Sequence, residues 1–389
     1  MVNMNRHFLR DIADIQTGPF GSQLHKEDYV DIGTPIVTVE HLGNRVFTEQ
    51  NLPKVSDEDK ARLSKYVLKE GDIVFSRVGS VDRCSYVDAA HDGWMFSGRC
   101  LRVRPNTEVD PLYLYYFFCL EDTKQFVRNI AVGATMPSIN TKLLGEVEVA
   151  YPSQTEQQKI VALLSALDDK IEINQKINDN LQQQAAALFA NFYDQAETEV
   201  GFTEMIQILG GGTPKTGESS YWNGDIPFFT PKDVGFPYTL TTEKTITEEG
   251  LAHCNSRLYP INTVFVTARG TVGKVGLPGV PMAMNQSCYA LVGKDTHQLL
   301  VYFYTLKAVD RLKHKASGAV FDAITTRDFE AENIMKLSDD DTKAFLDVAE
   351  PIYQAVLNNS IENLRLSELR DSLLPKLMNG EIDVTDIRL

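Results

Sequence analysis

Apolar side chains recur at alternating spacings of three and four residues in two stretches of the chain, 160–192 and 345–377. In the first stretch these positions are Ile160, Leu164, Leu167, Ile171, Asn174, Asn178, Leu181, Ala185, Leu188 and Phe192. At an offset of 185 residues they become Phe345, Ala349, Ile352, Val356, Asn359, Asn363, Leu366, Arg370, Leu373 and Leu377. A 4-3 spacing sustained over several heptads is typical of a coiled-coil seam. The pattern therefore predicts two long helices that are copies of each other.

The residues that flank these stretches suit helix ends. Ser153 followed by Glu156 predicts an N-cap at the start of the first helix. Asn379-Gly380 predicts the end of the second helix. Pro351 interrupts the second pattern, and we expect it to kink that helix or to begin it afresh after a short helix at 340–349.

The two longer segments that precede these helices also resemble each other. Both hold short apolar runs with many Gly and Pro residues, which indicates mixed strands and loops with a few helices. The run at 33–38 has a counterpart at 224–230, and the strand-to-loop run at 71–81 has one at 262–272. The plan is domain, helix, related domain, related helix, and the fold class is α+β.

This plan predicts four parts of the chain. The first domain covers 1–151, the first long helix 152–195, the second domain 196–338 and the second long helix 339–389. Two equivalent halves in one chain are expected to pack with pseudo-two-fold symmetry, so the two coiled-coil helices should run antiparallel.

Four asparagines lie on the predicted helix–helix seam. If the polar layers meet, Asn174 faces Asn363 and Asn178 faces Asn359. Buried Asn residues at a seam cost stability but fix the register of the helices. In the alternative reading, these side chains face solvent at the edge of the seam.

The net charge of −15 argues against simple nucleic-acid binding, because contacts to phosphates need cations. More than half of this excess falls in residues 151–195 and 338–389, so the two longer segments are close to neutral and each can carry a basic face. We expect the chain to bind DNA weakly alone and to need a partner that contributes cations.

Composition and motifs place the chain among cytoplasmic proteins without chemistry of their own. The five cysteines show no CxxC spacing, which favours reduced thiols and no metal site. The longest apolar run, 112–120, is too short to cross a bilayer, and no signal peptide is found. The glycine runs at 210–216 and 270–274 lack phosphate-loop spacing, and neither an adenine-pocket motif nor a cofactor loop of a methyltransferase is present. We therefore expect no catalytic residue and no cofactor in this chain.

Three segments resemble a known family. Residues 157–171, QQKIVALLSALDDKI, resemble the central conserved helix of type I restriction-modification specificity subunits. Residues 369–382, LRDSLLPKLMNGEI, are similar to the end of their C-terminal conserved helix. Residues 211–214, GGTP, with 221–227, YWNGDIP, look like the opening of their recognition domains, for which the first domain has the variant GPFGS at 18–22.

The resemblance implies a function. The two domains would be target recognition domains, each reading one half of a bipartite, asymmetric site in double-stranded DNA. The two helices would set the unspecific spacer and dock two methyltransferase subunits, and restriction/translocase subunits would join that core. Methyl transfer from S-adenosylmethionine to adenine would occur in the methyltransferase after base flipping, and ATP and Mg would be used by the translocase.

Loop residues that follow predicted strands or precede predicted helices are the candidates for DNA contact, because such side chains read bases and phosphates. The candidates are Arg77, Ser80, Arg83, Asn140, Lys142, Lys215, Arg269, Thr271, Lys274 and Arg327. For the loops after strands the alternative is a tight turn whose polar groups satisfy its own backbone. For Asn140 and its neighbours the alternative is a helix N-cap, and the basic run 307–315 reads equally as a solvated helix face.

Three other functions stay open at this point. The chain could be a protein-interaction scaffold that never reads bases, although duplicated loops tipped with Arg and Thr argue against that. It could be the recognition subunit of a methylation-only phage-defence complex. It could also be an enzyme with an unrecognised site, which a methylation assay on the isolated chain would reveal.

Overall fold

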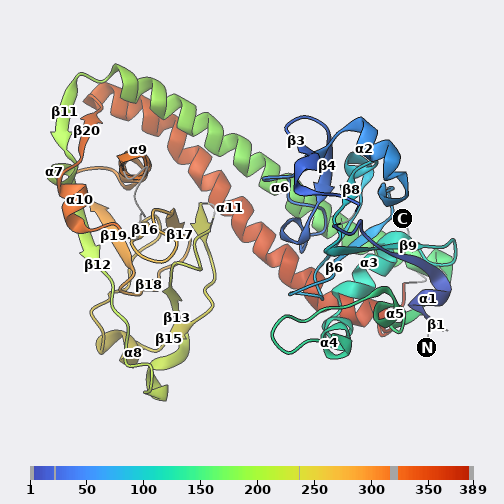
Figure 1. The fold of residues 1–389 in the computed structure, drawn as a ribbon. Helices are drawn as coiled ribbons and strands as arrows, with labels where there is room; N and C mark the ends of the chain where they lie inside the picture. The colour runs from blue at the N-terminus through green and yellow to red at the C-terminus, as the bar shows by residue number, and fades with distance from the viewer. Residues whose placement is uncertain (1–3, 22, 236, 316–322, 385–389) are drawn as a thin grey trace. The chain divides into compact units, whose positions relative to one another are not determined.

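The computed structural model describes residues 4–21, 23–235, 237–315 and 323–384 (Figure 1). The chain forms two compact units: unit 1 comprises Met1–Asp169 and Leu366–Leu389, and unit 2 comprises Lys170–Arg365. This division runs through both long helices. Each unit contains one strand-rich part together with portions of the two helices that pack against it.

The two long helices are α6 (Gln154–Gln195) and α11 (Asp339–Met378). Before α6, the backbone N–H of Ser153 donates to Glu156 at 3.1 Å, and the N–H of Glu156 donates to Ser153 Oγ at 3.4 Å. After α11, Gly380 takes a φ of +71°, which favours glycine. The helix start and the helix end expected from the sequence are therefore both confirmed.

Of the two outcomes expected at Pro351, the start of a new helix is wrong, because the whole range Asp339–Met378 is one helix. A kink at this position stays a prediction. Phe345, Ala349 and Tyr353 on both sides of the proline are buried in the core of unit 2. Because tertiary packing supplies most of the stability of a protein helix, this burial offsets the hydrogen bond that Pro351 cannot donate.

Unit 1 contains three small sheets. The first pairs β1 with β10 antiparallel, the second has the order β2-β9-β6-β7, and the third has the order β3-β5-β4-β8. The strands are β1 (Asn5–Phe8), β2 (Ala13–Thr17), β3 (Tyr29–Val30), β4 (Thr34–Val37), β5 (Lys54–Val55), β6 (Ile73–Ser76), β7 (Cys84–Tyr86), β8 (Met95–Phe96), β9 (Cys100–Pro105) and β10 (Glu148–Tyr151). The shorter helices are α1 (Leu9–Ile12), α2 (Asp57–Arg62), α3 (Pro111–Cys119), α4 (Glu121–Ile130) and α5 (Thr141–Leu144).

Unit 2 repeats this plan. It pairs β11 with β20 antiparallel, and its two larger sheets have the orders β12-β19-β16-β17-β14 and β15-β13-β18. The strands are β11 (Thr198–Gly201), β12 (Ile206–Gly210), β13 (Trp222–Phe229), β14 (Tyr238–Thr239), β15 (Thr245–Ile246), β16 (Val264–Thr267), β17 (Val275–Pro278), β18 (Ala283–Met284), β19 (Cys288–Gly293) and β20 (Asn333–Lys336). The shorter helices are α7 (Phe202–Met205), α8 (Glu248–Ala252), α9 (Gln298–Lys315) and α10 (Thr326–Glu330).

The strands match their sequences. β6 and β16 read IVFS and VFVT and are buried along their whole length, as expected for apolar strands covered on both faces. The related runs at 33–38 and 224–230 contain β4 and the end of β13. Each of these strands pairs in parallel with a two-residue strand, β4 with β8 and β13 with β18. The strand-to-loop repeat expected at 71–81 and 262–272 is thus present in both units.

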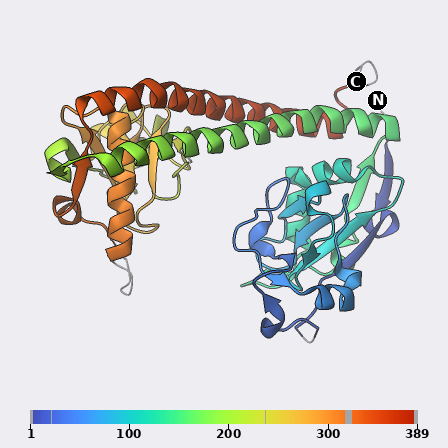
Figure 2. The same ribbon diagram turned by 90° about the horizontal axis from the view of Figure 1, so that it is seen from above.

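In each unit a helix from the strand-rich part packs on the long helices. In unit 2 this is α9, the orange helix in Figure 2. The ring of Phe303 on α9 lies 4.9 Å from that of Phe189 on α6 and 5.1 Å from that of Phe345 on α11, measured between ring centroids. In unit 1 the aromatic helix α3 occupies this place, and Tyr116 of α3 shares a core with Leu374 of α11. These interlocking rings fix each strand-rich part on its section of the helices.

No helix among the described residues is long and apolar enough to cross a membrane. All five cysteines are free thiols, and Cys84, Cys100 and Cys288 are buried.

Candidate nucleic-acid interface

Five loops meet at one end of the sheets in unit 1. We call them the loop edge of unit 1, and they comprise residues 18–21, 38–41, 77–83, 97–99 and 137–139. Backbone hydrogen bonds hold them together: Ser97 N–H donates to Val37 O at 2.8 Å, and Arg77 N–H donates to Arg99 O at 2.8 Å. Ile139 N–H then donates to Arg77 O at 2.9 Å. A strand end, two turns and the approach to α5 are thereby joined in one surface.

Unit 2 builds the same surface from residues 211–215, 230–233, 268–274, 285–287 and 323–325, the loop edge of unit 2. Asn285 N–H donates to Phe229 O at 3.0 Å, Ala268 N–H donates to Ser287 O at 2.8 Å, and Ile324 N–H donates to Ala268 O at 3.0 Å. These three bonds are the counterparts of the three in unit 1. The two loop edges are copies of each other down to the backbone.

The turns inside the loop edges also correspond. Gly79 and Gly270 take φ values of +76° and +81°, which only glycine adopts readily. The turn after β4 is closed by a bond from Thr38 N–H to His41 Nδ1 at 2.9 Å, and the turn after β13 by one from Thr230 N–H to Asp233 Oδ2 at 2.8 Å. These turns present short, defined backbones from which side chains project.

The three candidates expected in the first strand-to-loop segment lie on the loop edge of unit 1. The guanidinium of Arg77 donates to Gly98 O at 3.2 Å and lies 5.6 Å from the ring centre of Phe20. Arg83 is exposed but donates to Leu42 O, and Ser80 is exposed. Arg77 is half-buried and Arg83 exposed, and the structure gives both of them structural partners.

The candidates before α5 lie next to this surface. Asn140 caps α5 by accepting a 2.9 Å hydrogen bond from Leu143 N–H, which is the alternative role considered from the sequence. Lys142 lies in the first turn of α5 and is exposed. An N-cap leaves the amide nitrogen of Asn140 available for a ligand, so the two roles are compatible.

In unit 2 the candidates fall on or beside the loop edge. Lys215, Arg269, Thr271 and Lys274 are exposed on it, and Arg327 is exposed on α10, which follows directly. Thr267 ties its turn together, because its hydroxyl donates to Thr271 O and accepts from Lys274 N–H. This turn satisfies its own backbone and still presents its side chains outward.

Several cations on or beside the loop edges have no partner within the part of the chain that the structure describes. Among the described residues, no ion pair or hydrogen bond is found for the charged groups of Arg99, Lys142, Lys215, Arg269, Lys274 and Arg327. Arg99 was missed by the sequence reasoning, because the strand that precedes it, β8 (Met95–Phe96), has only two residues and gives no recognisable pattern. Its position beside Gly98, in the short loop before β9, is the one local signal.

The basic run on α9 has a structural role. Glu332 is buried, and it forms ion pairs with Lys315 and with Arg311 Nε at 3.7 Å. Arg311 also donates to Tyr193 Oη at 3.0 Å, and Lys307 lies over the Tyr193 ring at 5.1 Å. These cations attach α9 to the neighbouring elements of unit 2.

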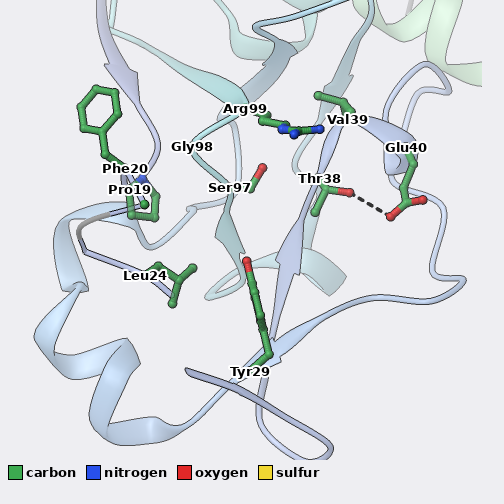
Figure 3. A pocket seen from close by; sticks show the side chains of 11 residues that line it. Pro19, Phe20, Leu24, Tyr29, Thr38, Val39, Glu40, Ser97, Gly98 and Arg99 are labelled. Carbon is green, nitrogen blue, oxygen red and sulfur yellow. Dashed lines mark hydrogen bonds between the residues drawn. The ribbon is translucent and has the colours of Figure 1, made fainter. Parts of the chain in front are cut away.

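A pocket of about 570 Å³ opens in the loop edge of unit 1 (Figure 3). Its lining includes Phe20, Tyr29, Glu40 and Arg99, with Tyr29 lying between Leu24 and Thr38 in the view. Thr38 Oγ1 donates to the carboxylate of Glu40 at 3.2 Å. Burial, followed by the charge of Asp28, raises the pKa of Tyr29, so its phenol is a neutral hydrogen-bonding group near pH 7.

The helix seam brings together the four asparagines singled out from the sequence. Asn174 Nδ2 donates to Asn363 Oδ1 at 2.8 Å, and Asn359 Nδ2 donates to Asn178 Oδ1 at 2.8 Å. Asn178 Nδ2 also donates to Val356 O, and Asn363 Nδ2 to Ile171 O, both at 3.4 Å. Each of these bonds has its counterpart at the offset of 185, so α6 and α11 run antiparallel here with local two-fold symmetry. That the asparagines set the register stays a prediction.

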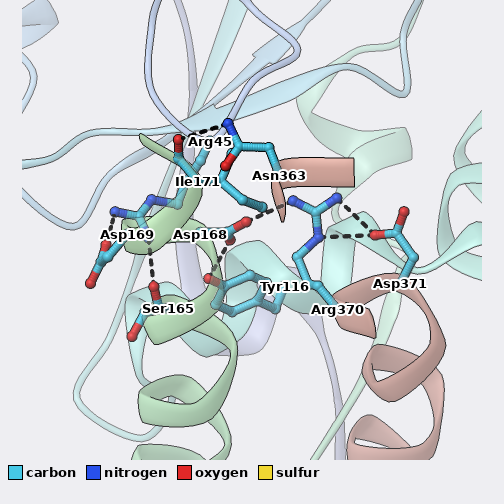
Figure 4. Close-up of polar contacts among 9 residues, drawn as sticks. All are labelled: Arg45, Tyr116, Ser165, Asp168, Asp169, Ile171, Asn363, Arg370 and Asp371. Carbon is cyan, nitrogen blue, oxygen red and sulfur yellow. Dashed lines mark hydrogen bonds and ion pairs between the residues drawn. The ribbon is translucent and has the colours of Figure 1, made fainter. Parts of the chain in front are cut away.

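A buried ion pair in unit 1 was not expected from the sequence (Figure 4). Asp168 is buried, and it accepts hydrogen bonds of 2.6 Å from both Tyr116 Oη and Arg370 Nη1. Burial alone would lower the pKa of Arg370, but the hydrogen bond and charge of Asp168 raise it above its usual value. Arg45 attaches the same stretch of α6 by pairing with Asp169. Arg370 broke the apolar repeat of the sequence because it is the partner of Asp168.

No group of three or more His, Cys, Asp or Glu side chains that could hold a metal ion occurs among the described residues. The two loop edges and the residues beside them offer cations, hydroxyls, side-chain amides and exposed backbone, which are groups that bind phosphates and base edges.

Comparison with known proteins places the chain in a family. It matches the family described as type I restriction modification DNA specificity domain over residues 1–183 and 198–336. It is 25% identical to the type I restriction enzyme HindI specificity subunit of Haemophilus influenzae, covering 84% of this chain and 89% of that protein. It is 23% identical to the MjaIX specificity subunit of Methanocaldococcus jannaschii, covering 97% and 93%.

A solved structure has the same fold. The crystal structure of the type I restriction-modification S subunit from M. genitalium aligns with a TM-score of 0.58 at 16% identity, over 97% of this chain and 96% of that one. Two matched specificity domains, two strand-rich parts with equivalent loop edges and two long helices agree with one another. The chain belongs to the type I restriction-modification DNA specificity subunits.

Proposed function

We propose that this specificity subunit reads a bipartite, asymmetric site in double-stranded DNA, one half with the loop edge of each unit. The observation that carries the proposal is the duplication of one loop edge, with the same backbone bonds, in a single chain. The side chains on the two copies differ, so two different half-sites are expected. Direct readout needs projecting side chains on a fixed backbone, and both loop edges have this construction.

The cations of the loop edges support contact with phosphates. Arg99, Arg269 and Lys274 are exposed and, within the described ranges, have no protein partner for their charged groups. They stand out against a net charge of −15, most of which lies elsewhere. Because so few cations are present, affinity for DNA must depend partly on other subunits of the complex.

The long helices are proposed to set the unspecific spacer between the half-sites. The 42 residues of α6 correspond to about 63 Å at ~1.5 Å per residue. Half-sites one helical turn apart are separated by about 34 Å, which such a helix can accommodate. The two asparagine layers repeat the same bonds between α6 and α11. A helix pair held in this way can define the length of the spacer.

The helices are also proposed to dock two methyltransferase subunits. The hydrogen bonds between α6 and α11 repeat at the offset of 185, so the pair presents two similar surfaces. Two similar surfaces suit two copies of one partner. In this proposal the methyltransferases carry S-adenosylmethionine and transfer methyl groups to adenine, restriction/translocase subunits carry ATP and Mg, and this chain contributes specificity without catalysis.

The experiment is co-expression with the methyltransferase of the same system, followed by single-molecule sequencing of methylated adenines. We expect one bipartite motif with an unspecific gap, and its loss when this chain is omitted. The matched control is a chain with an Arg269→Ala substitution, which should alter one half of the motif and leave the other half unchanged.

The outcomes separate the alternatives. Methylation that is unchanged without this chain would contradict the specificity role and favour a protein-interaction scaffold. A motif without any restriction of unmethylated phage DNA would indicate a methylation-only complex. Methylation by the isolated chain would indicate an enzyme.

A further inference from the structure

The pocket in the loop edge of unit 1 combines groups that phosphate binding does not need. Phe20 is 54% exposed and Tyr29 38% exposed, although large aromatic side chains are normally buried. Both line a pocket that also contains the anion of Glu40 and the cation of Arg99. A phosphate site would exclude the carboxylate. Aromatic rings beside one acceptor and one donor are the requirements for holding a planar heterocycle.

Unit 2 differs at the corresponding positions. The counterpart of Phe20 is Thr213 and that of Gly98 is Gln286, and these two side chains contact each other through Thr213 Oγ1 and Gln286 Oε1. In unit 1 a Cβ added at Gly98 would lie 2.3 Å from Pro19 O, so no side chain can bridge there. In unit 2 a side-chain contact therefore closes this part of the loop edge. In unit 1 the equivalent positions make no such contact.

The charge on the neighbouring turn is also reversed. Glu40 follows β4 in unit 1, and Lys232 occupies the same position after β13 in unit 2. Glu40 only accepts hydrogen bonds, whereas Lys232 only donates them. Thr38 Oγ1 holds Glu40 by a 3.2 Å hydrogen bond, so the carboxylate has a defined position at the pocket.

We propose that the unit 1 pocket receives one nucleobase of the bound half-site, unstacked from the duplex, and that this base donates its exocyclic amino group to Glu40. The proposal rests on the proposed function. Phe20 and Tyr29 supply the apolar and aromatic walls, and Arg99 supplies a donor for a ring nitrogen or carbonyl. Thymine has no exocyclic amine, so guanine, adenine or cytosine is expected.

The volume supports a whole base instead of a base edge. A pocket of about 570 Å³ falls in the range of about 300–1,000 Å³ that is common for small-molecule sites. Reading a base edge in a groove needs a side chain that projects, not a cavity. Enzymes that hold an extruded base use aromatic walls and hydrogen bonds to its edge in the same way.

The test uses the complex with its methyltransferase and a duplex that carries the methylated motif. In turn, each guanine, adenine or cytosine of the half-site read by unit 1 is replaced by inosine, purine or 2-pyrimidinone, which lack the amine. We expect one replacement to weaken the Kd of the wild-type complex by roughly 5- to 100-fold. The same replacement should have no further effect on a Glu40→Ala complex. Because this change is made in the DNA, it does not depend on the folding of a variant.

Extrusion is tested by mismatching the partner of that base. A mismatch lowers the cost of unpairing, so binding should tighten, by roughly tenfold for about 1.4 kcal/mol of relieved cost. Phe20→Ala should reduce this gain in affinity for the mismatched duplex. Lys232→Ala, the change in unit 2 that matches Glu40→Ala, should leave the effect of removing the amine in the unit 1 half-site unchanged.

Each result tests a different part of the proposal. If a methylated motif is found but no amine replacement depends on Glu40, the pocket proposal is overturned and the proposed function stands. If one amine replacement depends on Glu40 but the mismatched duplex binds more weakly, extrusion of the base is overturned. If no motif depends on this chain, the proposed function and the pocket fail together.

Discussion

Asn359 donates a 2.8 Å hydrogen bond from its Nδ2 to Oδ1 of Asn178, across the seam between the two long helices. At the offset of 185 the same bond runs from Asn174 to Asn363. Two layers of paired amide side chains thus lie between apolar positions of the seam, and we expect them to favour this register of the helices.

Removing one member of an asparagine pair should cost more than removing both. In Asn359→Leu, the buried Asn178 loses its donor, so we expect the free energy of unfolding of unit 2 to fall by about 1–3 kcal/mol. The double variant Asn178→Leu with Asn359→Leu should recover most of this loss, because both polar groups are gone. Urea unfolding followed by Trp222 fluorescence, in a chain with Trp94→Phe, measures unit 2.

The control for this cycle is Asn358→Ala, because Asn358 is the exposed neighbour on the same helix. It should change the free energy of unfolding by less than about 0.5 kcal/mol. Equal losses in the single and double variants would contradict the assignment of the pair.

Removing one partner of the buried ion pair between Asp168 and Arg370 should also cost more stability than removing both, and the loss should be larger than for the asparagine pair. Arg370→Met leaves Asp168 buried without its cation, and we expect unit 1 to lose about 3–5 kcal/mol of stability. The combination of Asp168→Leu, Arg370→Met and Tyr116→Phe should restore most of it. Trp94 fluorescence in a Trp222→Phe chain reports unit 1.

Lys376→Met provides the matched control, since Lys376 is exposed on the part of α11 that belongs to unit 1, and its side chain has no partner among the described residues. It should leave the Trp94 transition within about 0.5 kcal/mol of wild type. A similar loss from Lys376→Met and Arg370→Met would show that the ion pair is not responsible.

Much of the helical framework could be predicted from sequence, because a heptad pattern needs only local periodicity. The residues that break the pattern could not be interpreted. Arg370 stands at the position of the repeat where the first helix has Ala185, and its partner Asp168 lies 202 residues away. The restart of the helix expected at Pro351 was wrong for the same reason, since the packing of Phe345 and Tyr353 on both sides of it comes from distant elements.

Arg269 is expected to act on one half of the DNA site. Arg269→Ala should weaken binding of the complex to its motif by about 1–3 kcal/mol if it reads a base. A phosphate contact would instead weaken all sequences equally and lower the salt slope by about 1. Filter binding or fluorescence anisotropy at several salt concentrations, with matched and altered half-sites, separates these results.

Lys294→Ala is the control for this experiment. Lys294 lies just beyond the end of β19 that is opposite to the loop edge, and its Nζ donates to Thr203 O at 2.7 Å. The substitution removes one positive charge from the same strand-rich part. An equal loss of affinity in both variants would show that overall charge, and not the loop edge, governs binding.

Alkaline pH should destabilise the fold. Burial raises the pKa of Cys100 and of Cys288 from 9.0 to about 12. The folded state holds these protons more tightly, so stability is complete below pH 9 and falls as the pH rises from 9 towards 12. Each thiol contributes up to about 1.4 kcal/mol per pH unit.

Urea midpoints measured from pH 7 to pH 11 test this dependence. They should be constant to about pH 9 and then decrease. Cys100→Ala should flatten the decrease even if it lowers stability at pH 7, and an unchanged slope in that variant would contradict the role of this thiol. Cys254→Ala, a change at a partly exposed thiol, serves as the comparison.

The loop edges could be located only in part from sequence. The strand-to-loop segments pointed to Arg77 and Arg269 because a buried strand followed by Gly is a local signal. Arg99, Glu40 and Phe20 gave no such signal, since they meet only when three separate turns are joined by long-range backbone bonds. The difference between Gly98 and Gln286 becomes informative only after the two units are aligned through their structures.

The composition of unit 1 from two separated segments has a consequence for synthesis on the ribosome. Leu374, Leu377 and Met378 belong to the core around α3, yet they are made after all of unit 2. Unit 2 is contiguous, and its core needs no residue that is made after Arg365. Unit 1 begins first and must wait, with part of its apolar surface uncovered, for the last turns of α11. A ribosome-bound chain that ends at residue 365 and continues into a linker long enough to fill the exit tunnel should therefore hold a protease-resistant unit 2 and a protease-sensitive unit 1.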